Sequence, residues 1–181
     1  REMNKHRTNT AQRYREQIHA LQSRGIGVMA MFTFGFDHDG PDVFKETLEF
    51  CETSDLFCAS FGVLTPFPGT PVFERLVAEG RLRTRDWRLY DMQQVVYDLP
   101  NWPPGTLEAG VRWLEERFYA PANLARRALR LRRYPKLLRP TSLYLHAVVN
   151  LQYAATIRQR RRGVAVNTAG VPHAEPLSAS Y

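Results

Sequence analysis

The sequence predicts an α/β protein in which a parallel β-sheet is followed by an α-helical C-terminal region. Residues 27–34 and 56–64 are apolar without alternation, which is typical of strands buried on both faces of a parallel sheet. A helical pattern of about a dozen residues lies between them, which is the length of connection that parallel strands require. After residue 103 apolar residues recur at helical spacing, which predicts a helical second part.

The first half of the chain alternates predicted helices and strands. Its predicted elements are a helix at 8–24, a strand at 27–34, a helix at 41–53, a strand at 56–64 and a short helix at 72–79. Tyr14, Ile18 and Leu21 recur at helical spacing in the first helix, and Pro41 suits the first position of the second. Two strands leave their edges and faces uncovered, so we expect further strands from a missing segment, or a chain that is unstable alone.

The second half is predicted to be mainly helical. An irregular segment rich in Trp, Tyr and Pro comes first, with one short candidate strand at 94–97. Helices are then predicted at 103–119, 121–134 and 141–160, the first of them with Leu107, Val111, Leu114 and Phe118 on its apolar face. The predicted organisation is a sheet domain at 1–82, a mainly helical domain at 83–162 and a disordered tail at 163–181.

The net charge of +7 is distributed unevenly. Residues 1–111 contain 12 Lys and Arg against 15 Asp and Glu, whereas residues 112–181 contain 13 against 3. Such a basic block can bind nucleic acid or an anionic membrane, or it can be a solvated helix face. We favour a basic outer face over a leucine stripe at 126–139, leave peripheral membrane contact open, and do not expect nucleic acid as a partner.

Cys51 and Cys58 are the only cysteines, which indicates a reducing, cytoplasmic setting. Their spacing matches no metal site, so we expect both to pack as small apolar side chains and predict no metal ligands. The longest apolar run, 143–157, is shorter than a membrane span and is interrupted by polar residues. The chain begins with Arg and has no secretory signal, so we expect it to be a piece of a longer protein.

Polar and glycine-rich turns follow both predicted strands, where α/β enzymes place their functional loops. Asp37, His38 and Asp39 can bind a metal or perform acid–base chemistry, or they can form the turn or hydrogen-bond a ligand. Gly35 permits either close approach of a ligand to the backbone or an unusual turn. The proline-rich loop at 65–71 is either a rigid ligand-binding loop or a rigid connector. The aromatic residues of the second half are predicted to be core rather than a stacking platform: Trp87, Tyr90, Trp102 and Trp113.

Several spaced motifs together resemble the C-terminal half of a radical S-adenosylmethionine (SAM) barrel, over about residues 3–160. The matching motifs are the turn GFDHD, the helical pair Phe44 and Thr47, and the loop TPFPGT at 65–70. The segment after residue 78 is similar to the helical domain that follows the barrel in cobalamin-binding radical SAM proteins. The resemblance implies a partial parallel (β/α) barrel followed by an α-helical C-terminal domain.

The resemblance also implies a ligand and a missing half. The adenosyl part of SAM would contact residues after both strands: Phe34, Gly35, Phe36, Leu64, Thr65 and Gly69. The family's C-x-x-x-C-x-x-C motif, which holds a [4Fe–4S] cluster, is absent here. We therefore expect the cluster, and a cobalamin domain if one is used, on an N-terminal half that this chain lacks, and no cofactor bound tightly to the chain alone.

Two functions follow from these observations. The first is a fragment of a radical SAM enzyme, of the cobalamin-linked type, that cleaves SAM at the cluster and modifies, for example methylates, an unactivated carbon of a small-molecule or lipid-like substrate. No catalytic residue is assigned. The alternative is a non-catalytic docking module or remnant that associates with a cluster-bearing partner or a membrane surface.

Overall fold

The computed structural model describes the backbone of residues 11–167 and the side chains of residues 11–160. Its helices and strands are α1 (Ala11–Ser23), β1 (Met29–Phe34), α2 (Val43–Thr53), β2 (Cys58–Val63), α3 (Pro71–Ala78), α4 (Thr106–Phe118), α5 (Pro121–Arg130) and α6 (Pro140–Asn167), with short 3₁₀ turns at Trp87–Leu89, Leu131–Arg133 and Pro135–Leu138. Both predicted strands and all predicted helices are confirmed. The candidate strand at 94–97 is only an isolated antiparallel bridge between Leu82 and Tyr97.

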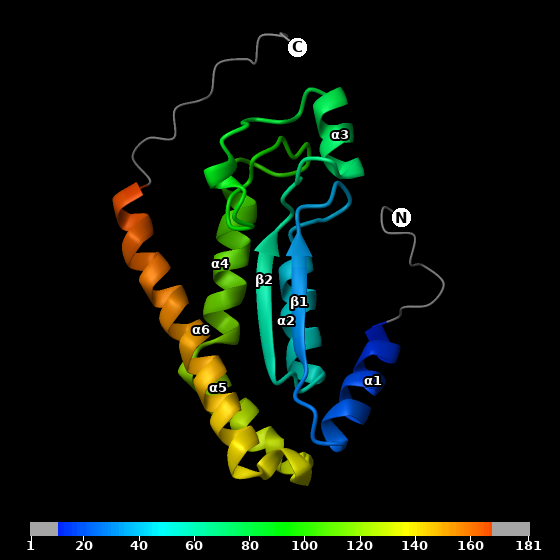
Figure 1. The fold of residues 1–181 in the computed structure, drawn as a ribbon, viewed down its shortest axis with the longest axis vertical. Coiled ribbons are helices and arrows are strands. Elements are labelled where there is room, and N and C mark those ends of the chain that lie inside the picture. The colour runs from blue at the N-terminus through cyan, green and yellow to red at the C-terminus, as the bar shows by residue number, and fades with distance from the viewer. Residues whose placement is uncertain (1–10, 168–181) are drawn as a thin grey trace.

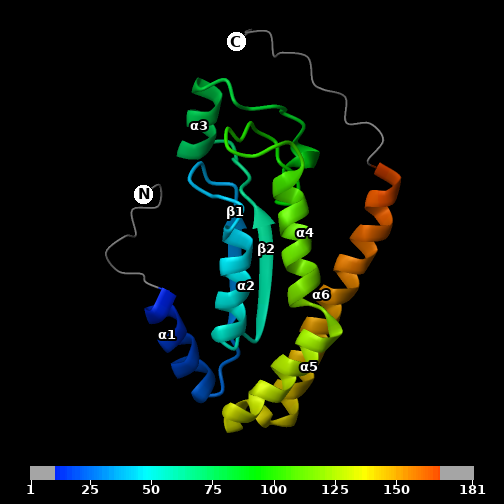
Figure 2. The same ribbon diagram turned by 180° about the vertical axis from the view of Figure 1, so that it is seen from behind.

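β1 and β2 form a two-stranded parallel sheet, as predicted, with Met29 opposite Cys58 and Phe34 opposite Val63. Figures 1 and 2 show α2 lying across one face of the sheet, whereas no described element crosses the other face. β2 is largely buried, but Met31 of β1 is 73% exposed on the uncovered face. The prediction that residues 27–34 are buried on both faces was therefore wrong, because the described part of the chain supplies a layer for one face only.

A single cluster of buried residues runs from the sheet into the helical second half. Phe34 of β1 packs on Phe44 of α2 at 5.1 Å between ring centroids, and Phe44 packs edge-on against Trp102 at 5.7 Å. The predicted apolar residues of α4 are all buried in the same cluster: Leu107, Val111, Leu114 and Phe118. The boundary predicted at residue 82 therefore lies within a continuous core.

Gly110 allows α4 to approach α2 closely, and Gly110→Ala is expected to destabilise the fold. A methyl group there would lie 2.0 Å from the ring of Phe44, which Phe34 and Trp102 hold in place. Alanine gains about 1 kcal/mol of helix propensity over glycine. Overpacking costs about 1–3 kcal/mol or more, and we expect this cost to exceed the gain in propensity. The net expectation is that Gly110→Ala lowers the free energy of unfolding by about 2 kcal/mol.

Urea denaturation checks this expectation, with Ala109→Gly on the exposed side of the same helix as control. The free energy of unfolding of that control should fall by about 1 kcal/mol, because only helix propensity is lost. Combining Gly110→Ala with Phe44→Leu should recover part of the loss. A stabilised Gly110→Ala protein would show that the helices can move apart freely.

The basic segment after α4 is not a simple outer face over leucines. Arg127 is buried, with its guanidinium 3.8 Å from the Phe118 ring centre and hydrogen-bonded to the Asn150 side chain at 2.6 Å. Arg130 and Arg133 reach the buried carboxylate of Asp55 at 3.2 and 3.0 Å. The favoured interpretation of residues 126–139 is corrected accordingly, because several of these arginines attach the helical region to the α2–β2 connection.

Two further predictions need correction. Trp87 was predicted to be core but is 53% exposed, whereas Tyr90 and Trp102 are buried and Trp113 is half-buried. α6 continues to Asn167, into the segment predicted as a disordered tail, and residues 168–181 lie outside the described residues. Within the described part of the chain, no helix combines the length and apolarity needed to cross a bilayer.

Candidate functional site

The residues that follow β1 and β2 lie side by side at one edge of the sheet. The Leu64 N–H donates to the Phe34 carbonyl at 2.8 Å, which continues the strand pairing by one residue. Figure 1 shows the connections after both strands and α3 gathered at this end. We call Phe36, Leu64 and the loop 65–70 the rim. The two sequence motifs are thus brought together, although about thirty residues separate them.

The carboxylate of Asp39 forms the turn after β1. Its Oδ2 accepts the N–H groups of Gly35 at 2.8 Å and Phe36 at 3.0 Å. Both backbone donors are therefore engaged inside the chain and do not point to a ligand. Of the two interpretations of this turn, the structure favours turn formation for Asp39. No group of three or more metal-ligating side chains occurs among the residues that the structure describes.

Asp37 attaches the turn to α3 and the segment after it. Its carboxylate lies 2.9 Å from Arg75 and 2.5 Å from Arg81. The hydrogen bond from Arg81, more than any other contact, holds the pKa of Asp37 below its ordinary value. Asp37 is therefore an ion-pair partner, while His38 points to solvent beside it. The pair fixes the relative positions of the two loops at the rim.

Gly35 is a turn glycine enclosed by protein. Its φ of +105° is unfavourable for other residues, and a β-carbon would lie 2.6 Å from the Tyr97 hydroxyl and 2.8 Å from a Leu107 methyl group. The Tyr97 hydroxyl donates to the Gly35 carbonyl at 2.6 Å. Any larger residue at this position would disturb folding, so a substitution here cannot by itself test ligand binding.

The loop 65–70 is rigid for identifiable reasons. Thr65 is buried, and its hydroxyl donates to the Val63 carbonyl at 3.3 Å. Thr70 caps α3 by accepting the Phe73 N–H at 3.3 Å, and it donates to the Phe67 carbonyl at 2.7 Å. Gly69 adopts a φ of +80° in open space. The loop therefore presents a fixed surface next to the sheet.

The resemblance implies six ligand-contacting residues, and only some of them are accessible to a ligand in this structure. Phe34 is buried against Phe44, and Gly35 and Thr65 are also buried. Phe36 and Leu64 are half-buried, and Gly69 is exposed. A ligand at the rim would therefore contact Phe36, Leu64 and the outer part of the loop. These side chains offer apolar surface suited to a flat ring.

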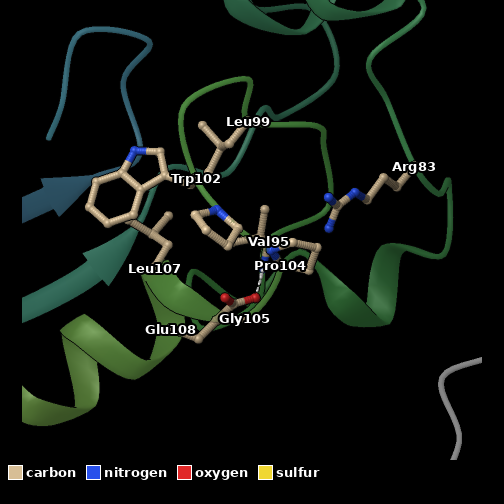
Figure 3. Close-up of a pocket in the computed structure, with 9 residues that line it drawn as sticks. Arg83, Val95, Leu99, Trp102, Pro104, Gly105, Leu107 and Glu108 are labelled. Atoms are coloured by element: carbon tan, nitrogen blue, oxygen red, sulfur yellow. Dashed lines mark hydrogen bonds between the residues drawn. The ribbon is translucent and has the colours of Figure 1, made fainter. Parts of the chain in front are cut away.

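A small cavity lies at the start of α4, beneath the irregular segment that precedes this helix, as Figure 3 shows. Its volume of about 10 Å³ is roughly that of one water molecule, and Val95, Leu107 and Glu108 are among its lining residues. One oxygen of Glu108 accepts the Val95 N–H at 3.2 Å, and the other has no partner among the described residues. This cavity is too small for a nucleoside.

A groove of about 660 Å³ runs along β1 between α1 and α2. Sequence reasoning missed it. Tyr14 and Ile18 of α1, Phe32 of β1 and Phe50 of α2 are among the residues that line it. The groove borders the sheet edge that a two-stranded sheet was expected to leave uncovered. That expectation could therefore have indicated a groove here.

The two cysteines are buried and free, which confirms their predicted packing role. Burial raises the pKa of Cys51 to about 12. Burial also raises the pKa of Cys58, whose sulfur lies 3.2 Å from the Tyr119 hydroxyl. A [4Fe–4S] cluster is held by at least three thiolates, and this chain has only two cysteines, so they do not fit a cluster.

Comparison with curated proteins shows that the chain is similar to methyltransferases. It is 35% identical over 91 residues to the bacteriochlorophyllide d C-12(1)-methyltransferase of Chlorobaculum tepidum, covering 50% of this chain and 20% of that protein. It is 25% identical over 101 residues to the C-8(2)-methyltransferase of the same organism, covering 56% and 22%. It is 33% identical over 67 residues to the hopanoid C-2 methylase of Rhodopseudomonas palustris, covering 37% and 13%.

The chain thus spans about a fifth of the length of the first two relatives. No family model matches the chain, and no solved structure matches it.

Proposed function

We propose that this chain is the C-terminal part of a radical SAM methyltransferase. In this proposal β1 and β2 are late strands of a parallel (β/α) barrel, and α4, α5 and α6 form the helical domain that follows it. The observation that carries the proposal is the similarity to methyltransferases, combined with two parallel strands whose following loops meet at one rim. The alternative of a non-catalytic docking module is not favoured by these relatives.

The proposed role of the rim is to bind the adenosyl end of SAM. Phe36 and Leu64 would contact the adenine ring through apolar surface, and the loop 65–70 would close one side of the site. Asp37 and Asp39 would act indirectly, by holding the turn after β1 in place. Because the backbone donors of Gly35 and Phe36 are already used, specificity would come from shape and from groups on the rest of the protein.

The cluster and any cobalamin would be held by parts of the protein outside this chain, since its own cysteines do not fit a cluster. A small-molecule or lipid-like substrate is proposed from the relatives, whose names give a bacteriochlorophyllide and a hopanoid. The buried, free cysteines accord with the cytoplasmic setting that we propose for the protein.

Phe36→Ala and Leu64→Ala should each lower the affinity for SAM about tenfold, or about 1.4 kcal/mol. Each removes apolar contact with the ring, and both residues are half-buried, so the fold should persist. The measurement is anaerobic equilibrium dialysis with labelled SAM, made on the full protein that contains this chain.

Val77→Ala, an exposed apolar residue on α3, is the matched control and should bind SAM as the parent does. Thermal midpoints without SAM show whether each variant is folded. Unchanged SAM affinity in well-folded Phe36 and Leu64 variants would remove the rim from the binding site. Absence of labelled methyl transfer from SAM to any product would argue against the methyltransferase itself.

A further inference from the structure

The outward side of α6 is apolar over its first half. Tyr144 is 68% exposed and Leu151 is 62% exposed, with Leu145 and Val148 exposed between them. We call these four residues the α6 strip. The opposite side of the helix packs on the protein through a different set: His146, Asn150, Ala154 and Ile157. A surface helix normally carries polar residues on its outward side, so the strip indicates an interaction surface.

Two exposed leucines lie near the start of α6. Leu138 precedes the helix, and Leu143 lies in its first turn on the side that carries His146 and Asn150. Figures 1 and 2 show α6 as the outermost helix, on the side of α4 away from the sheet. No described element covers the strip.

The charges around the strip all have one sign. Residues 121–160 contain nine Lys and Arg and no Asp or Glu, and no charged residue occurs between Arg139 and Arg158. Arg132, Lys136 and Arg139 lie before the strip and Arg158 lies after it, all of them exposed. None of these four has an acidic partner among the described residues, whereas Arg130 and Arg133 nearby pair with Asp55.

We propose that α6 and the turn before it form a docking surface for an anionic membrane. An apolar helix face bracketed by cations is the chemistry of a helix that lies in the plane of a bilayer interface. The strip would enter the boundary between headgroups and acyl chains, and the four cations would contact anionic headgroups.

The positive charge around the α6 strip argues against two other kinds of partner. A second copy of the chain would bring two sets of cations together, which is unfavourable. A nucleic acid would engage the arginines but leave Tyr144 and Leu151 unexplained. The proposal does not depend on the proposed function, because the surface lies on α6 and the rim lies at the ends of the strands.

The test is co-sedimentation of the full protein that contains this chain with vesicles. Binding is expected to vesicles of equal parts phosphatidylcholine and phosphatidylglycerol, and not to phosphatidylcholine alone. The double variant Tyr144→Gln/Leu151→Gln and the double variant Arg132→Gln/Arg139→Gln should each weaken partitioning at least about tenfold.

Matched controls change the same residue types elsewhere. Val77→Gln/Met92→Gln removes exposed apolar side chains, and Arg85→Gln/Arg88→Gln removes exposed cations. Both controls should partition as the parent does, and circular dichroism shows that every variant is folded. No binding to anionic vesicles, or equal binding to neutral ones, would overturn the proposal. Two other results would also overturn it. One is a dimer, seen by sedimentation velocity, that the Tyr144→Gln/Leu151→Gln variant no longer forms. The other is RNA binding that is tighter than the binding to anionic vesicles.

Discussion

Phe118→Ala is expected to destabilise the protein by about 3–5 kcal/mol, because it removes a large buried ring. The ring is 1% exposed, lies edge-on to Phe61 at 5.5 Å and to Tyr119 at 5.0 Å, and supports the guanidinium of Arg127 at 3.8 Å. Truncation therefore leaves a cavity between β2 and α4 and also deprives a buried cation of its aromatic partner. Urea denaturation measures the loss.

Two variants on the same helix define the scale of this effect. Leu114→Ala, at a fully buried position, should cost about 2–5 kcal/mol. Arg117→Ala changes an exposed side chain that lies 5.8 Å from the Trp113 ring centre, and it should cost about 0.5 kcal/mol or less. If Arg117→Ala proved as costly as Phe118→Ala, the buried face of α4 would be assigned wrongly.

The elements that the sequence predicted well are those with local signals. The four apolar residues of α4 recur at helical spacing, and all four are buried. The parallel pairing of β1 and β2 followed from two unbroken apolar runs and a helical connection. Local patterns do not report what covers a surface, which explains the errors at Met31 and Trp87, both apolar and both exposed.

Contacts between distant residues were not predictable in the same way. Asp55 pairs with Arg130 and Arg133, more than seventy residues further along the chain. From the sequence, these arginines looked like a solvated face, because nothing local distinguishes a paired arginine from a free one. The close approach at Gly110 was also missed, since an isolated glycine in a helical pattern carries no indication of its neighbour.

The proximity of the two loops at the candidate site was predictable, whereas the exposure of their side chains was not. The motifs after the two strands do meet at one edge, because parallel strands end on the same side of a sheet. Whether Gly35 serves a ligand or a turn depends on Tyr97, which donates to it from 62 residues away. The side chains left accessible at the rim, Phe36 and Leu64, could be recognised only once the buried ones were known.

His146 is expected to contribute a loss of stability as the pH falls from about 7 to about 4, because it is buried as the neutral imidazole. Burial, and secondarily the nearby charge of Arg127, lowers the pKa of His146 from 6.5 to about 4. Its ring packs edge-on against Phe57 at 4.7 Å, and its Nε2 has no hydrogen-bond partner among the described residues. Among the described residues no carboxylate offsets the cost of a proton there, and the charge of Arg127 adds to that cost.

The sign follows from proton linkage. The unfolded chain binds a proton at His146 near pH 6.5, whereas the folded chain resists it until about pH 4, so stability is lost as the pH falls through this window. At about 1.4 kcal/mol per pKa unit, the full loss is about 3 kcal/mol and levels off below pH 4.

Urea denaturation at a series of pH values measures how steeply the free energy of unfolding changes with pH. His146→Gln and His146→Phe should both flatten this slope whatever their effect on packing, because the slope depends on proton uptake alone. A parent slope retained by both His146 variants would assign the acid sensitivity to other groups.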